Sequence, residues 1–381
     1  MHPAPIDTVR HVLIAGASTR AAAESAARAG FAVTALDAFG DLDQAPGVRA
    51  LSLPRDFGRP FTAAGAARAA RGIAVDAVSY VSGFENHPRA VASLAATRAL
   101  WGNAPDVLRC VRDPHRLAAV LRDRGFASLD VRVETQAWQP DGRAWLMKPL
   151  ASGGGHHIRR WQEGARLPRG YYLQERIDGT PSSVVFVADR HRAVPLAVTR
   201  QLVGEAAFGA AGFRYCGSLL PAPVSAAMLE RAHALTAAVT EAFGLVGVNT
   251  IDFMAHGDVP YLVEVNPRWS ASMELVERAC GANMFTAHAD ACERGVLPSP
   301  EIVSSFRQVY GKAVVFARRD VIVRDAERWL ADPTIRDVPH TGESIRAGRP
   351  VCTVFASAAD EARCRVALEQ RAAAVYAMLG A

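Results

Sequence analysis

Residues 251–270 read IDFMAHGDVPYLVEVNPRWS, two apolar segments with alternating polarity around a polar turn at 256–258. This pattern predicts a β-hairpin. Side chains two positions apart on a strand share a face, so Glu264 and Asn266 point together, and the turn brings Asp252 across from them. Hard oxygen donors of this kind are the ligands that Mg²⁺ prefers, so these three residues are the predicted metal ligands.

Arg268 extends the same pattern, because it lies two residues after Asn266 and is expected on the same face. Its paired N–H donors are suited to holding a phosphoryl group. A polar hairpin closed by ordinary salt bridges is the alternative interpretation. Pro267, which fixes the exit of the second strand, and the following Trp-Ser-Ala-Ser favour a functional site.

A second candidate is Lys148, which ends the segment LMKPL and precedes a loop made of Ser152, Gly153, Gly154 and Gly155. A cation beside a loop with almost no side chains lets backbone N–H groups approach phosphate oxygens. The lysine precedes the glycines, so the loop is not a Walker P-loop, and a flexible glycine hairpin remains the alternative. The chain has 41 arginines and two lysines, Lys148 and Lys312, which favours a function for the lysine retained here.

The N-terminal part is predicted to be a parallel α/β unit. HVLIAGAS from His11, an alanine-rich segment to Gly30 and FAVTALDAF fit strand, glycine turn, helix and strand. The turn lacks the G-x-G-x-x-G spacing of dinucleotide-binding folds. A further strand at 74–83 ends before Glu85, at the edge of the sheet where open α/β folds bind ligands. Glu85 is thus a candidate substrate contact, with a solvated loop carboxylate as the alternative.

The remaining chain alternates strands and helices. Helical periodicity predicts one linker helix over 106–130, and VRVETQAW at 131–138 reads as a strand. Later helices are expected at 226–243, 272–279 and 359–379, with strands between them.

Composition excludes several classes of protein. The 381 residues are 50% hydrophobic, and the net charge of +5 contains no basic block typical of a nucleic-acid-binding face. Six cysteines lack any C-x-x-C pair, which argues against a zinc knuckle. No run of eighteen apolar residues and no signal peptide is present, so the sequence predicts a cytoplasmic protein with small-molecule substrates and no membrane or nucleic-acid partner. A homodimer is the default assembly.

Taken together, Lys148 with its glycine loop, QERIDG at 174–179, IDF at 251–253 and EVNPRWS at 264–270 resemble the ATP-grasp superfamily of carboxylate-amine ligases and related carboxylases. The resemblance implies an α/β and α+β fold: a Rossmann-like pre-ATP-grasp domain, an ATP-grasp fold of two α+β lobes, and a small C-terminal β-rich element. The implied domains are 1–105, the pre-ATP-grasp α/β domain; 106–190, the small lobe with the linker helix; 191–300, the large lobe with the metal site; and 301–381, a C-terminal hairpin, expected over 339–356, and a helix completing the large lobe.

The same resemblance implies roles for individual residues. Lys148 and the loop of Ser152, Gly153, Gly154 and Gly155 would contact the phosphates of ATP. Gln174, Glu175 and Ile177 would form the hinge that holds adenine. Asp252, Glu264 and Asn266 would bind two Mg²⁺ ions, with Mn²⁺ as a substitute. Arg268 and Lys148 would be the catalytic cations. Many members have a second nucleotide-binding lysine, and here Arg112, His115 and Arg116 are the candidates for that position.

The implied activity is ATP-dependent amide formation through an acyl phosphate, with release of ADP. Arg200, Gln201, Arg214 and Tyr215 are candidates to contact an acidic substrate. SGFENHP, TRQLVG and FRYCGS are similar to a bacterial ATP-grasp group associated with tetrahydromethanopterin and methylofuran cofactors, which implies addition of glutamate to a one-carbon cofactor. The alternatives are a bicarbonate-using carboxylase of the biotin-carboxylase or purine type and a catalytically silent ATP-binding regulator.

Overall fold

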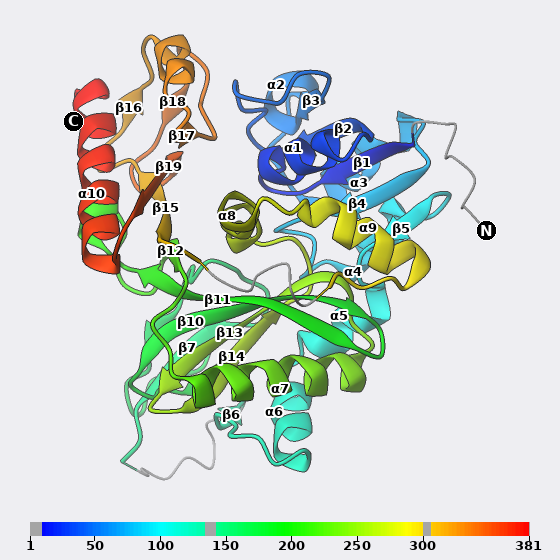
Figure 1. Ribbon diagram of the computed structural model, residues 1–381, viewed down its shortest axis with the longest axis vertical. Coiled ribbons are helices and arrows are strands. Elements are labelled where there is room, and N and C mark those ends of the chain that lie inside the picture. Colours follow the sequence, from blue (N-terminus) through cyan, green and yellow to red (C-terminus); the bar gives the residue numbers. More distant parts are fainter. Residues whose placement is uncertain (1–9, 134–141, 300–305, 381) are drawn as a thin grey trace.

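A computed structural model describes residues 10–133, 142–299 and 306–380. The expected strand at 131–138 lies mostly outside the described residues. Within the described ranges, a parallel N-terminal sheet, a small antiparallel sheet and a large antiparallel sheet surround a central cavity, with α10 along the C-terminal edge (Figure 1). This arrangement confirms the mixed α/β and α+β fold class.

The N-terminal sheet is parallel throughout, in the order β3-β2-β1-β4-β5. Its strands are β1 (His11–Ala15), β2 (Ala32–Asp37), β3 (Arg49–Ser52), β4 (Ala77–Tyr80) and β5 (Ala99–Trp101), and its helices are α1 (Arg20–Arg28), α2 (Leu53–Phe57), α3 (Ala63–Ala69) and α4 (Pro88–Leu94). Four of the five β1 side chains are fully buried, as expected for a strand covered on both faces. The predicted strand–turn–helix–strand opening is confirmed.

The segment expected to be one helix over 106–130 instead forms two helices, α5 (Pro105–Val111) and α6 (Pro114–Asp123). Pro114 disfavours helical geometry at the residue before it. Asp113 adopts an extended conformation there, and its carboxylate accepts hydrogen bonds from the N–H groups of His115 and Arg116. The break is thus a helix end followed by a new N-cap.

The small sheet has the order β6-β9-β7-β8 among the described residues. Its strands are β6 (Val131–Arg132), β7 (Trp145–Pro149), β8 (Arg159–Arg160) and β9 (Tyr171–Glu175). β7 and β9 pair antiparallel, and in their register Leu146 is the cross-strand partner of Gln174 and Lys148 is the partner of Tyr172. Lys148 and Gln174 therefore lie on one face of this sheet.

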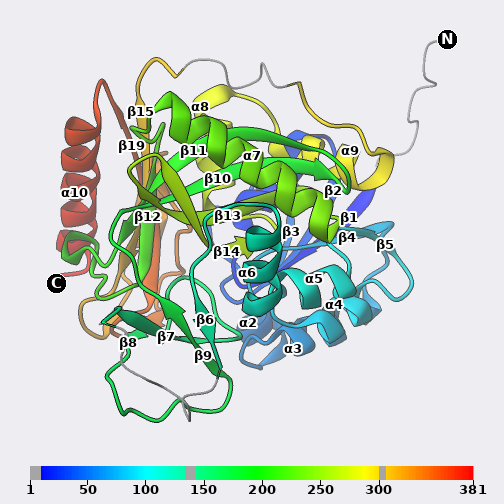
Figure 2. The ribbon, with the colours of Figure 1, turned by 90° about the horizontal axis from the view of Figure 1, so that it is seen from below.

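Eight described strands form the large sheet, in the order β14-β13-β10-β11-β12-β15-β19-β17. They are β10 (Thr180–Asp189), β11 (Ala193–Val203), β12 (Tyr215–Leu220), β13 (Val246–His256), β14 (Val259–Asn266), β15 (Val309–Phe316), β17 (Ile335–Arg336) and β19 (Pro350–Ala358). Helix α7 (Ala226–Phe243) packs on one face, as Figure 2 shows, and α8 (Ala271–Cys280) and α9 (Met284–Arg294) lie between the other face and the N-terminal unit (Figure 1).

The hairpin expected over 339–356 is not present, because its two strands pair elsewhere. β18 (Ser344–Ile345) pairs with β16 (Val321–Ile322) in a separate two-stranded sheet, whereas β19 pairs with β15 and β17. Between them the chain turns at 346–349, where the N–H of Gly348 donates to the Ala317 carbonyl. Helix α10 (Glu361–Met378) packs on β15 and β19, close to the expected closing helix.

Asn103 connects the N-terminal unit to the metal hairpin, which we define as β13 and β14. Its side chain is fully buried, and its Nδ2 donates to Asn249 Oδ1 at 2.8 Å and to the Pro267 carbonyl at 3.0 Å. Its Oδ1 accepts a hydrogen bond from the N–H of Val246 at 2.9 Å. A single amide thus satisfies several buried groups and fixes the position of the hairpin.

All six cysteines are unpaired thiols, which agrees with the absence of a C-x-x-C motif. In the parts of the chain that the structure describes, no helix combines the length and apolarity needed to cross a bilayer.

Candidate active site

A cavity of about 830 Å³ opens where the three sheets meet. Side chains from the N-terminal unit, the small sheet and the large sheet all line it. Among the predicted site residues, the lining contains Lys148, Gly153, Gly154, Gly155, Gln174, Glu175, Ile177, Asp252, Glu264, Asn266 and Arg268. Ser152 lines a small adjoining pocket instead. Residues that are more than 100 positions apart in sequence therefore share one cavity.

The predicted metal ligands converge on the metal hairpin. Asp252 faces Glu264 across the two strands, and Thr250 faces Asn266. The Asn266 amide donates to Asp252 Oδ2 at 2.8 Å, while Gln201 donates to Asp252 Oδ1 at 2.9 Å. Because Asp252 and Glu264 are direct partners across the two strands, their carboxylates share the face that lines the cavity. The predicted convergence of Asp252, Glu264 and Asn266 is present in the structure.

The two carboxylates have different electrostatic surroundings. Burial and, after it, the neighbouring Glu264 together raise the pKa of Asp252 to about 7. Burial also acts against ionisation of Glu264, but Arg112, Lys148 and Arg268 lower its pKa below the usual value. The pair therefore holds one firmly ionised carboxylate beside another that resists ionisation until a cation binds.

These residues fit a divalent metal ion by their chemistry. Two carboxylates and an amide oxygen supply hard oxygen donors, and because burial and then Glu264 raise the pKa of Asp252, a bound cation would stabilise its ionised form. Among the described residues, no group of three or more His, Cys, Asp or Glu side chains is arranged to hold a metal; this site offers two carboxylates and an amide.

Lys148 is 4% exposed, and its ammonium donates to Gln174 Oε1 at 2.9 Å. Gln174 in turn donates from Nε2 to the Val263 carbonyl at 3.1 Å. Since Val263 precedes Glu264, this chain of hydrogen bonds ties the small sheet to the metal hairpin. A lysine at this position extends from a strand into the cavity, as predicted, with its charge beside the two carboxylates.

The glycine loop closes against the large sheet. The Gly154 carbonyl accepts a hydrogen bond from the N–H of Tyr215 at 3.1 Å. Gly155 has a φ of +75°, and a Cβ built there would lie 1.8 Å from the Phe213 carbonyl oxygen. Glycine is required at this position by both the backbone conformation and the close contact.

Of the three candidates Arg112, His115 and Arg116, Arg112 is the residue that reaches the site. It follows α5, and its Nη1 donates to Glu264 Oε2 at 3.2 Å and to the Val265 carbonyl at 2.9 Å. Its Nη2 donates to the Ser152 carbonyl at 3.0 Å. Arg116 is exposed and contacts Cys110.

Arg268 is held by a carboxylate from the N-terminal unit. Its Nε and Nη2 donate to Glu85 Oε1 at 3.0 and 2.9 Å, and Nη2 also donates to Asn266 Oδ1 at 2.9 Å. Glu85 is 2% exposed, which excludes the solvated loop carboxylate considered from sequence. Although burial acts against ionisation, Arg268 and then Arg112 lower the pKa of Glu85. The guanidinium is therefore fixed beside the metal hairpin.

The four residues suggested for an acidic substrate divide into two pairs. Gln201 and Tyr215 line the cavity. Arg200 instead forms an ion pair with Glu361 of α10, and Arg214 donates to the Gly348 carbonyl at 2.6 Å. The two arginines thus take part in contacts with the C-terminal segment.

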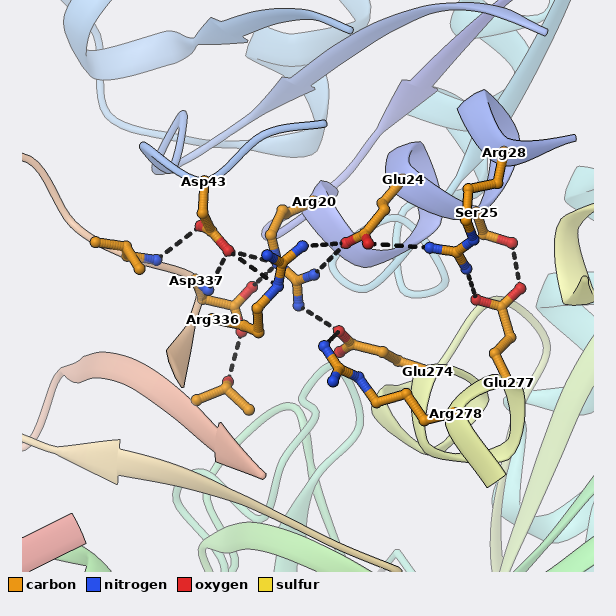
Figure 3. A network of polar contacts seen from close by, with 12 residues as sticks. Arg20, Glu24, Ser25, Arg28, Asp43, Glu274, Glu277, Arg278, Arg336 and Asp337 are labelled. Carbon is orange, nitrogen blue, oxygen red and sulfur yellow. Dashed lines mark hydrogen bonds and ion pairs between the residues drawn. The ribbon is translucent and has the colours of Figure 1, made fainter. Parts of the chain in front are cut away.

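Sequence analysis missed a polar network at the end of the cavity next to α1 (Figure 3). Arg20, which is fully buried, donates to Asp337 at 2.7 Å, to Glu274 at 2.7 Å and to Glu24 at 2.9 Å. Lys312 donates to Glu274 at 2.6 Å. The scarcity of lysine marked Lys312 as unusual, but its partners come from segments that no local pattern connects.

Comparison with known proteins agrees with this geometry. Residues 113–272 match the family of ATP-grasp domains. An uncharacterised protein of Methanocaldococcus jannaschii is 22% identical over 267 residues, which cover 67% of this chain and 63% of that protein. The large chain of carbamoyl phosphate synthase from Myxococcus xanthus is 26% identical over 244 residues, which cover 57% of this chain and 22% of the relative. The chain thus spans less than two thirds of the length of either curated relative.

The fold also matches solved structures. The L-amino acid ligase of Bacillus licheniformis superimposes with a TM-score of 0.71 over 96% of this chain and 97% of the ligase, at 14% identity. At that identity the match establishes the arrangement of the three sheets.

Proposed function

We propose that this chain joins a carboxylate to an amine with release of ADP, because residues 113–272 match the family of ATP-grasp domains and the fold matches that of an L-amino acid ligase. One observation carries the proposal: three cations converge on Glu264 of the metal hairpin, Lys148 and Arg268 from the main cavity and Arg112 from the small adjoining pocket. Three fixed cations beside two carboxylates are suited to bind a polyphosphate together with its metal ions.

ATP would extend from the hinge to the metal hairpin. Gln174, Glu175 and Ile177 would contact adenine at the cavity wall formed by the small sheet. Lys148, Arg112 and the backbone of Ser152, Gly153, Gly154 and Gly155 would contact the phosphates. Their shared place in the lining of the main cavity or its adjoining pocket, and the hydrogen bonds of Lys148 and Arg112 to residues of that lining, support this assignment.

The metal hairpin would hold the metal ions of the nucleotide. Asp252, Glu264 and Asn266 would bind two Mg²⁺ ions, or Mn²⁺ in their place. Bound Mg²⁺ neutralises charge on the transferred phosphoryl group and on ADP. Gln201 and Asn266, which already bond to Asp252, hold its carboxylate in position for this role.

The chemistry proceeds in two transfers. A substrate carboxylate oxygen attacks the γ-phosphorus of ATP, and the bond from phosphorus to the ADP oxygen breaks, giving an acyl phosphate. The amine nitrogen then attacks the acyl carbon, so that a C–N bond forms as the C–O bond to phosphate breaks, and the nitrogen loses its proton. Arg268, oriented by Glu85, would stabilise negative charge on the phosphoryl oxygens.

We further propose that glutamate is the amine substrate and that the acid belongs to a one-carbon cofactor. The sequence similarity to the cofactor-associated group supports this choice. We also keep the domain boundaries at 1–105, 106–190, 191–300 and 301–381, and we propose a cytoplasmic homodimer.

ADP release from MgATP by the purified chain tests the function. It is measured with bicarbonate, with L-glutamate, and with L-glutamate plus a small-molecule extract of a producing organism. We expect release that requires the extract and glutamate together, and loss of that release in Glu264→Ala. The control is Glu241→Gln, which changes a residue in an exposed ion pair with Arg124.

The other outcomes separate the alternatives. Release driven by bicarbonate alone identifies a carboxylase. Binding of MgATP without release of ADP in any mixture identifies a regulator and contradicts the proposed ligase.

A further inference from the structure

We propose that Asp41 forms the binding subsite for the amine substrate, contacts it as an ammonium group, and accepts one proton from it before the neutral amine nitrogen attacks the acyl carbon. This inference rests on the proposed function, because it assigns the part of the cavity that would hold the second substrate. Asp41 lies in the loop after β2 and lines the cavity together with Phe39 and Asp337.

The carboxylate of Asp41 has an unsatisfied buried oxygen. The residue is 6% exposed, and its Oδ2 has no hydrogen-bond partner among the described residues. A buried carboxylate oxygen without a partner is costly, so an unpaired group that faces a cavity indicates a ligand with a donor.

The loop that carries Asp41 is fixed on both sides. The N–H of Leu42 donates to the Val338 carbonyl at 2.8 Å, and Asp43 Oδ1 accepts a hydrogen bond from the Val338 N–H at 2.8 Å. The N–H of Gly40 donates to Asp37 Oδ1 at 2.7 Å. Asp41 therefore cannot relieve its burial by moving with a flexible loop.

Cations near this end of the cavity are already paired with other carboxylates (Figure 3). Arg20 donates to Asp337, Glu24 and Glu274, and Lys312 donates to Glu274. Asp337 also accepts a hydrogen bond from Thr353 through its second oxygen. Each of these neighbours has its partner within the network. A partner for Asp41 must therefore come from a molecule that binds in the cavity.

The surroundings favour a cation over a neutral donor. Burial raises the pKa of Asp41 well above its usual range, and the nearby carboxylates of Asp337, Asp37 and Asp43 raise it further, against a lowering by Arg20. The potential at Asp41 is thus strongly negative. An ammonium group supplies both the missing N–H donors and the missing positive charge, and the ring of Phe39 adds an apolar wall for the carbon chain.

The test uses the full chain and its Asp41→Asn variant, with Asp290→Asn as the control. Asp290 lies in an exposed ion pair on α9, away from the cavity. The probes are n-butylammonium, 1,4-diaminobutane, L-alanine and L-glutamate, with n-butanol as the uncharged match, and the readout is the melting temperature.

We expect Asp41→Asn to melt at least as high as the wild type without ligand, because the substitution removes a carboxyl group that burial and its carboxylate neighbours disfavour. At least one ammonium probe should raise the melting temperature of the wild type and of Asp290→Asn, n-butanol should not, and Asp41→Asn should lose the increase. An increase retained in Asp41→Asn, or no increase with any ammonium probe in the wild type, overturns the subsite.

ADP release separates this inference from the proposed function. With the amine that supports turnover, Asp41→Asn should raise the KM for that amine about ten- to a hundredfold and leave the KM for ATP unchanged. Turnover with equal amine KM in both proteins rejects the subsite and leaves the ligase. Ammonium binding that depends on Asp41 without any turnover rejects the ligase and leaves the subsite.

Discussion

Glu85 Oε1 accepts two hydrogen bonds from Arg268, from Nε at 3.0 Å and from Nη2 at 2.9 Å, across 183 residues of sequence. Both side chains are buried, at 2% and 9% exposure. The N-terminal unit thereby fixes a cation that lies just after the metal hairpin, so the proposed substrate contact and the proposed phosphoryl contact form one ion pair.

Breaking this pair should cost stability as well as activity. Glu85→Ala leaves the Arg268 guanidinium buried without its carboxylate and should lower the free energy of unfolding by about 3 kcal/mol. Combining it with Arg268→Met should cost less than the sum of the two single changes, because the second change removes the orphaned charge. Urea unfolding of the four proteins measures the coupling. Strict additivity would show that the two side chains do not interact.

Removing Glu264 should abolish activity and spare the fold. Glu264→Ala deletes a proposed metal ligand and should reduce ADP release at least a hundredfold, an order of magnitude set by losses at metal sites. The repulsion that raises the pKa of Asp252 also disappears, so the melting temperature should not fall much. Glu241→Gln, in an exposed pair with Arg124, should retain full activity. Near-normal turnover in Glu264→Ala would refute the metal assignment.

The glycine loop offers a matched pair of substitutions. Gly155 and Gly164 have nearly equal φ angles of +75° and +77°, so alanine pays a similar backbone cost at each position, about 1 kcal/mol. A Cβ at 155 collides with the Phe213 carbonyl, whereas a Cβ at 164 meets no described atom within 4 Å. Gly155→Ala should raise the KM for ATP about tenfold or more, since misplacing the loop misplaces the phosphate contacts. Steady-state kinetics giving both variants the same KM would contradict this role.

His288 should make stability depend on pH. Burial lowers its pKa to about 4 from an ordinary value of 6.5, and its Nδ1 accepts a hydrogen bond from the Val248 N–H at 3.1 Å. The unfolded chain binds a proton at this residue below about pH 6.5 and the folded chain does not until about pH 4, so stability falls as the pH decreases through that window. The total loss should be about 3 kcal/mol.

Urea unfolding at pH 7.5 and pH 4.5 measures this loss. In His288→Gln the difference between the two pH values should shrink by most of that amount, while the exposed His191→Gln should behave like the wild type. An unchanged difference in His288→Gln would assign the pH dependence to other groups.

The metal hairpin could be predicted because its geometry is local. Asp252 and Glu264 are separated by one tight turn, and alternation along a strand determines which side chains meet. The position of Lys148 followed in the same way from a strand end and a glycine loop. In such local structures, the number of residues between two side chains largely determines the distance between them in the fold.

Contacts between remote segments could not be predicted. Glu85 was open to two interpretations, because its partner Arg268 lies 183 residues further along the chain, just after β14. The choice among Arg112, His115 and Arg116 depended on the break before Pro114, which the apolar periodicity of 106–130 concealed. The family resemblance placed the segments of β18 and β19 in one hairpin, yet β18 pairs with β16, and β19 pairs with β15 and β17.

The hydrogen bonds of Asn103 have a consequence for exchanging domains between related proteins. Its amide completes hydrogen bonds for Val246, Asn249 and the Pro267 carbonyl, all on the nucleotide side of the molecule. An N-terminal unit transplanted from a relative to change substrate preference must bring a carboxamide at this position, or the hairpin loses its anchor. Chimaeras of this fold should therefore be spliced after residue 103 and judged first by whether that one amide is preserved.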